Sequence, residues 1–166
     1  MAAISVSNKD WTVVNAVATA LTNATISGQA VFAAVAATTA DTQATDVQLA
    51  GEGPRAVVRY VTTTEDYGLE DGRACMVVME ILIAAKVAPA ADESSRMTEI
   101  LRLKNAAINA VEASPPADAA AWAEGRRFHI PLQWGRPEID TTESAPWVLA
   151  KLPVKVSLVL QDPAYH

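Results

Sequence analysis

The strongest pattern in the chain is an apolar run from Ala74 to Val87. Apolar residues occupy both sets of alternating positions in this run, so a strand formed by it is covered on both faces and belongs at the centre of a sheet. The valine-rich segment 56–62 predicts a second strand. Between them lie residues 63–73, which are polar, acidic and twice interrupted by glycine. This arrangement predicts an antiparallel β-hairpin with a long tip.

Two segments have the period of an amphipathic helix. The first begins at Ser7 to Asp10, and its apolar stripe consists of Trp11, Val14, Val17, Ala18 and Leu21. Its outward face carries threonine, asparagine and alanine in place of lysine and glutamate. We interpret this face as lying in a groove of the same domain, and a partner-binding face is the alternative.

The second helix is predicted from Asp92 to about Ala113, and Pro115 and Pro116 end it. Asp92 and Glu93 suit the positive end of the helix dipole. The apolar stripe of this helix is formed by Met97, Ile100, Leu101, Leu103, Ala107, Ile108 and Val111.

Three further strands are predicted. Residues 30–35 form a short one, and residues 128–134 alternate between apolar and polar, with Pro131 indicating an edge or a bulge. The last runs from about Trp147 to Leu160, where Pro153 also indicates a bulge or an edge. Residues 138–145 are predicted as a polar loop and residues 161–166 as a loose tail.

Together these elements predict one α+β domain over residues 1–166, with helices on one face of a single, mainly antiparallel, twisted β-sheet that contains the long hairpin. A length of 166 residues with 51% hydrophobic residues suits one globular core. The chain has thirteen basic and nineteen acidic residues, a net charge of -6, which disfavours binding to nucleic acid phosphates. The span from Trp11 to Ala40 is uncharged, but polar residues interrupt it too often for a membrane helix, so we expect a soluble, intracellular protein.

No set of residues indicates catalysis. One cysteine, Cys75, and two histidines are too few for a Cys/His metal site, and Cys75 lies in the apolar strand. The only dense carboxylate group is in the hairpin tip, and its spacing is not that of a calcium loop. We therefore predict no catalytic, cofactor-binding or metal site and no cofactor.

The hairpin tip has two interpretations. One is a solvated tip, and the other is a protein-contact loop, because Tyr67 and Leu69 interleave the acidic residues. The candidate interface residues are Glu65, Asp66, Tyr67, Leu69, Glu70, Asp71 and Arg73.

The order of elements from Trp11 to Leu160 resembles the tail terminator, or tail completion, family of long-tailed bacteriophages, and more loosely the neck and head–tail joining proteins. The resemblance depends on an early aromatic helix, on Val-Val-Arg-Tyr at 57–60, on the acidic tip and on Val-Val-Met-Glu-Ile at 77–81, followed by a helix and closing strands with Trp134 and Trp147. Residues 43–55 and 136–146 are longer than that family suggests.

The resemblance implies a structural virion protein without enzymatic activity. It would form a homohexameric ring that terminates the tail tube and offers a joining surface to the head side. Its partners would be further copies of itself, the tail tube protein and a neck or head–tail connector protein. DNA would pass through without specific binding, and no membrane would be involved. The protein would be assembled in the host cytoplasm and located at the tail–neck junction. The alternatives are a neck or head–tail adaptor and a small α+β ligand-binding or enzymatic domain.

Overall fold

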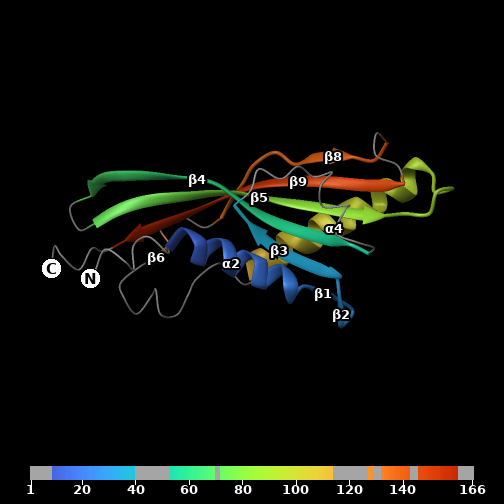
Figure 1. Ribbon diagram of the computed structural model, residues 1–166, viewed down its shortest axis with the longest axis horizontal. Helices are drawn as coiled ribbons and strands as arrows, with labels where there is room; N and C mark the ends of the chain where they lie inside the picture. Colours follow the sequence, from blue (N-terminus) through green and yellow to red (C-terminus); the bar gives the residue numbers. More distant parts are fainter. Residues whose placement is uncertain are drawn as a thin grey trace.

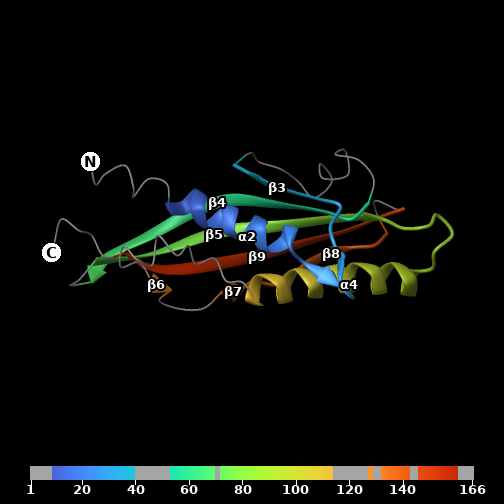
Figure 2. The ribbon, with the colours of Figure 1, turned by 90° about the horizontal axis from the view of Figure 1, so that it is seen from below.

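A computed structural model describes residues 9–39, 53–69, 72–113, 127–128, 132–142 and 146–160. These residues form two layers, a long twisted β-sheet and a pair of helices on one of its faces (Figures 1 and 2). The α+β class and the mainly antiparallel sheet are as predicted. None of the helices in this part of the chain is long and apolar enough to cross a membrane.

Three long strands form the centre of the sheet. They are β4 (Arg55–Leu69), β5 (Gly72–Lys86) and β9 (Trp147–Leu160), with β5 in the middle as its two-sided apolarity predicts. The strand β3 (Ala34–Thr38) pairs with β4 and is parallel to it. The far edge of β9 pairs with three short antiparallel strands: β6 (Arg127–Phe128), β7 (Gln133–Trp134) and β8 (Glu138–Asp140).

The two helices, α2 (Lys9–Thr22) and α4 (Glu93–Ala113), pack on the same face of the sheet, as predicted. Their buried stripes meet alternate residues of the long strands, and burial of each such side chain is worth on the order of 2 kcal/mol. The fully buried members of this core include Val14, Val17 and Leu21 of α2, Ile100, Leu103 and Val111 of α4, and Met79, Ile81 and Val154 of the sheet.

Local chemistry sets the start of α4. The backbone N–H of Ser95 donates a hydrogen bond to Asp92 Oδ1 at 2.8 Å, which makes Asp92 the N-cap of the helix. Hydrogen bonds from Ser95 lower the pKa of Asp92 below its ordinary value. The prediction that the helix begins at Asp92 and ends at Ala113 is therefore confirmed, with Asp92 as its cap.

The predicted boundary of the hairpin tip is wrong. Residues 63–69 continue β4, and β5 already begins at Gly72, so most of the predicted loop 63–73 is strand. In the backbone register Glu65 pairs with Cys75 and Asp66 with Ala74. The far side of β5 is paired with β9 over the same residues, so the neighbouring strands extend a segment whose own strand propensity is low.

Three other predictions need correction. Trp11 is 40% exposed and lies outside the core, because the buried side of α2 is centred on Val17 and extends to Val13 and Ala20 on the flank away from Trp11. Part of the predicted loop 138–145 is the strand β8. The predicted strand 30–35 is replaced by β3 at 34–38 and by a ribbon of β1 (Thr25–Ile26) and β2 (Gln29–Ala30).

The turn of that ribbon explains its position. Ser27 and Gly28 have φ angles of 52° and 79°, so both central residues are left-handed, as a two-residue hairpin turn requires. Glycine adopts this conformation without strain, and serine does so only where the surrounding pairing holds it there.

Pro153 lies inside a paired strand without disturbing the ladder. Its carbonyl accepts a hydrogen bond from Gly135 N–H at 2.8 Å, so the side on which proline lacks a donor faces the break between β7 and β8. Gly135 comes so close that a Cβ there would be 2.9 Å from Pro153 Cβ. The bulge or edge predicted at Pro153 is therefore not a shift in the pairing of β9 with β5, and the break lies in residues 135–137, between β7 and β8 and opposite the proline. Of the predicted strand 128–134, the ends are β6 and β7, and 129–131 lie outside the described residues.

Candidate assembly surface

The outer half of the hairpin is an arm of the sheet. β3 pairs with β4 only from Arg55 to Arg59, and a β-bulge between Tyr60 and Thr62 follows at once. Beyond it β4 and β5 continue together, with β9 alongside, to a tip that projects past the N-terminal end of α2 (Figure 1). A bulge bends the bulged strand and increases its twist, so the arm leaves the line of β3 at this point.

The candidate interface residues belong to the end of this arm. Glu65, Asp66, Tyr67 and Leu69 are in the last part of β4, and Arg73 is in the first part of β5. Glu70 and Asp71 lie outside the described residues, as do the side chains of the other five. The backbone thus brings the group together at one end of the molecule, and its role in contacts remains a prediction.

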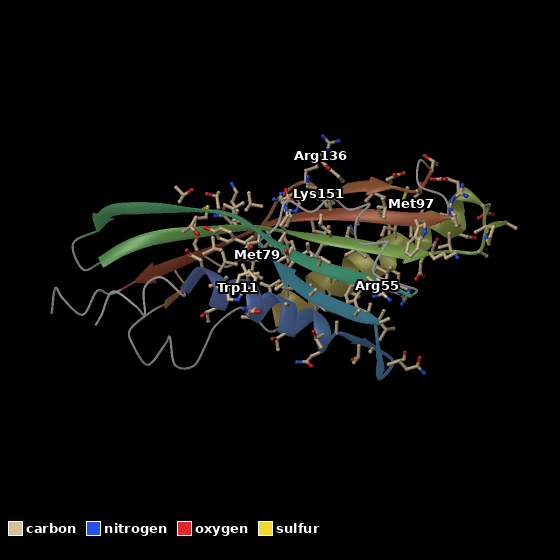
Figure 3. The ribbon with its side chains drawn as sticks, in the orientation of Figure 1. Trp11, Arg55, Met79, Met97, Arg136 and Lys151 are labelled. Carbon is tan, nitrogen blue, oxygen red and sulfur yellow. The ribbon has the colours of Figure 1, made fainter. Side chains whose placement is uncertain are left out.

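A second surface is notable for lacking charge. The exposed residues between Trp11 and Thr39 form what we call the neutral surface, which follows α2, the β1–β2 ribbon and β3 (Figures 1 and 3). Trp11 and Ile26 are 40% and 38% exposed. The other members are Asn15, Thr19, Thr22, Asn23, Thr25, Ser27, Gly28, Gln29, Ala30, Ala33, Ala34, Ala36 and Thr39.

The interpretation that the outward face of the first helix lies in a groove of its own domain is wrong. This face does not lie in such a groove, because Asn15, Thr19 and Thr22 are exposed. Depletion of charged residues is the compositional mark of the central part of a protein interface. The signal was present in the sequence as an uncharged run from Trp11 to Ala40. In its helical part a partner-binding face was the alternative interpretation, and the exposure of these residues favours that alternative.

A groove of about 560 Å³ lies beside the neutral surface, between the end of α2, β1 and the outer side of α4. Small and amide side chains dominate its lining, including Ala20, Ala24, Asn105 and Asn109. Arg102 is the charged residue of this lining, and its Nη2 is 2.7 Å from Glu99 Oε1. The hydrogen bond to Glu99 raises the pKa of Arg102. These groups can bind by packing and amide hydrogen bonds, and the lining contains no nucleophile paired with a base.

Charged side chains gather on the opposite, helix-free face. Arg59 of β4 donates two hydrogen bonds to Glu80 of β5, with Nη2 2.7 Å from Oε2. Lys151 of β9 lies 3.5 Å from Glu80 and 4.0 Å from Glu138 of β8. This ionic row crosses four neighbouring strands, and Figure 3 shows Lys151 and Trp11 on either side of the central strands. The row joins strands to each other, and we assign it a structural role.

The described part of the chain contains no group of three or more His, Cys, Asp or Glu residues placed to hold a metal ion.

Comparison with known proteins adds a likeness among solved structures. No protein-family model and no curated protein matches the sequence. Among solved structures, a chain of the structure described as "Virion of native gene transfer agent (GTA) particle" is similar over 86% of this chain and 84% of that chain, with 14% sequence identity and a TM-score of 0.39.

Proposed function

We propose that this chain is a structural virion protein of the bacteriophage type, and that it forms a homohexameric ring that terminates the tail tube and offers a joining surface to the head side. The order of elements on which the resemblance depends supports the proposal: an N-terminal helix, a long hairpin, a second helix and closing strands on one sheet. The family's ring, its position at the tail–neck junction and its partners come to this chain by that resemblance.

The observation that carries the proposal is the neutral surface. A protein that acts alone in water usually surrounds its core with lysine, arginine and acidic residues, whereas residues 11–39, which include most of α2, the ribbon and β3, contain none. Burying such a surface against a partner removes no charge from water, so it costs little desolvation energy. A surface of this kind suits a subunit that is covered in an assembly better than a free-standing enzyme.

We assign the other proposed partners to other parts of the molecule. The acidic arm tip is the candidate for docking on the tail tube protein or on the neck connector, since charged groups give such contacts register and partner choice. The net charge of -6 suits a ring through which DNA passes without being held.

The test is the assembly state of the purified protein. Negative-stain images and light scattering should show rings of six subunits, either for the protein alone or after addition of tail tubes. A tube-capping assay then separates the terminator from the neck adaptor, because a terminator binds the tube end and stops its growth. Monomers that neither form rings nor bind tubes or neck proteins would contradict the proposal.

A further inference from the structure

The outward face of α2 has an uncharged counterpart on the opposite side of the molecule. It lies on the helix-free face of the arm, just beyond the bulge at Tyr60. We define this arm-root surface as Thr62 and Thr64 of β4 together with Met76 and Val78 of β5. In the backbone register Thr62 pairs with Val78 and Thr64 with Met76, so the four residues form one compact group on two neighbouring strands.

The face to which this group belongs follows from the alternation along β5. Val77 and Met79 are fully buried in the helix-side core, so Met76 and Val78 lie on the other face of the sheet. Thr62 is exposed, as is Thr64, and the two residues of β5 are half-buried. The arm-root surface is therefore an accessible part of the sheet with apolar side chains in it.

Charged residues border the arm-root surface without belonging to it. The ionic row lies two residues farther along β5, at Glu80, and Lys155 of β9 pairs with Val78. Val61, at the bulge beside the surface, is 38% exposed. Burying threonine, methionine and valine against another uncharged surface costs little desolvation energy.

The arm-root surface and the outward face of α2 lie back to back. Met79 belongs to the core that the buried stripe of α2 covers, and Figure 3 shows it in the same part of the molecule as Trp11. Val78, the neighbour of Met79 along β5, is on the opposite face of the sheet. Trp11, Asn15 and Thr19 are exposed on the side of the helix that faces away from the sheet. One layer of sheet and one helix thus separate the two surfaces.

Such an arrangement meets the requirement of a ring. In a closed ring each subunit contacts one neighbour through one surface and the other neighbour through a different surface, and a rotation relates the copies. Surfaces on opposite sides of a subunit satisfy this condition, because a copy that covers one of them leaves the other open to a third copy. A surface that paired with itself would end the assembly at a two-fold dimer.

We propose that the outward face of α2, as part of the neutral surface of one copy, packs on the arm-root surface of a second copy. The inference rests on the proposed function, because it names the contact between neighbouring ring subunits. The occupant is a second copy because the two surfaces match in their lack of charge and lie on opposite sides of the same chain. Trp11 on one side and Met76 on the other supply apolar anchors, since tryptophan and methionine are enriched at the centre of protein interfaces.

Charge insertion and charge exchange test the contact. Asn15→Lys or Thr19→Lys places a cation on the outward face of α2, and Thr62→Glu or Thr64→Glu places a carboxylate on the arm-root surface. Each single variant should weaken self-association at least about tenfold, because it buries an unpaired charge. A chain with one of these lysines and one of these glutamates should regain association in at least one of the four combinations, since the lysine of one copy then meets the glutamate of the next. Sedimentation equilibrium measures association, and circular dichroism checks the fold.

Two controls make the result specific. Thr98→Lys, at an exposed position of α4 outside both surfaces, should associate like the wild type. A chain with Asn15→Lys and Thr62→Lys should stay dissociated, because like charges then meet. Undiminished association of the single variants, or no recovery in any of the four combinations, would overturn the contact.

Electron microscopy of the same variants, with and without tail tubes, separates this inference from the proposed function. Wild-type rings of six that the single variants lose and an exchange variant regains support both. Rings that persist in every single variant overturn the contact and leave the ring intact. Oligomers other than rings with the same loss and recovery support the contact and contradict the ring, and a wild type that is monomeric under both conditions contradicts both.

Discussion

At Glu80 a single charged side chain interrupts the apolar sequence of the central strand. Its side chain is 15% exposed and lies between the cations of Arg59 and Lys151. A charge so poorly solvated is tolerated because both partners and good hydrogen-bond geometry are present. The neighbouring residues Leu82 and Leu149 are buried on the same face, so the row lies beside a small apolar cluster.

We expect Glu80→Ala to lower the free energy of unfolding by about 2 kcal/mol, because it leaves two partly buried cations facing each other. Glu80→Gln should lower it by less, since the amide oxygen can still accept from Arg59. Glu138→Ala is the matched control, because Glu138 is 74% exposed and 4.0 Å from Lys151, and its loss should be below about 0.5 kcal/mol. Urea unfolding of the three variants measures the differences. Equal effects at the two positions would contradict the structural role of the row.

The cap at Asp92 predicts a pH dependence. Its pKa is lowered in the folded protein, so the cap stabilises α4 fully at pH values above the ordinary carboxyl value of about 3.9 and is lost as the pH falls through the lower, folded value. At neutral pH Asp92→Ala should therefore unfold at a lower urea concentration than the wild type, and this difference should shrink as the solution is acidified below that ordinary value.

Asp92→Asn provides the control, because the amide caps the helix without titrating. Its free energy of unfolding should be close to that of the wild type at neutral pH, and in acid it should fall by less than that of the wild type. Curves for wild type and Asp92→Ala that stay parallel throughout the acid range would show that Asp92 does not cap the helix in solution.

At the scale of elements, the sequence predicted those with a strong period or a two-sided apolar run, namely β5, β9 and α4. It failed where neighbours decide the structure. Residues 63–69 contain Glu65, Asp66 and Gly68, which are unfavourable in strands, and the segment is strand because β5 pairs with it. Spacing alone allows two stripes on α2, and only the position of the sheet shows that the Val17 side is buried and Trp11 is not. β8 is three residues long and exists through its pairing with β9.

The arm tip gives the next prediction. Replacing residues 67–73 with a short Gly-Ser turn should leave the subunit folded, because pairing continues inward from Asp66 and Ala74. The same change should impair ring formation or docking on the tube end, since it removes Tyr67, Leu69 and most of the acidic group. Circular dichroism checks the fold, and light scattering with a tube-capping assay checks the function. Unchanged mass together with unchanged capping would exclude the tip from assembly.

Cys75 provides a further test at the same arm. It is a residue of the central strand, paired in the backbone register with Glu65 on one side and Leu158 on the other. We expect slow reaction with a thiol reagent in the folded protein and fast reaction in urea, because the apolar sequence of β5 predicts that this cysteine is a core residue. Prompt stoichiometric labelling without denaturant would contradict the assignment of Cys75 to the core.

At the scale of the whole molecule, the α+β class, the single sheet and the helices on one face followed from the pattern of the chain. The candidate assembly surface followed only in part. The arm tip was predicted from its mixture of acids with Tyr67 and Leu69. For the uncharged face of the first helix a partner-binding role was only the alternative interpretation, because an uncharged run becomes evidence of a contact only when its residues are found to be exposed. Exposure depends on packing between segments that are distant in the sequence, so the local spacing of apolar and polar residues does not predict it.

The place of Pro153 has a consequence for how the sheet selects one alignment. Apolar alternation in β9 forbids displacement by one residue, because that would turn the core residues outward, but it tolerates displacement by two. Within β9, Lys151 pairs with Glu138 and Lys155 with Gln133, and Pro153 lies between them opposite Gly135. Moving β9 by two residues would put the proline where β7 or β8 needs a donor, and would separate Gly135 from the ring it accommodates. One missing N–H thus distinguishes alignments between which the hydrophobic pattern cannot choose.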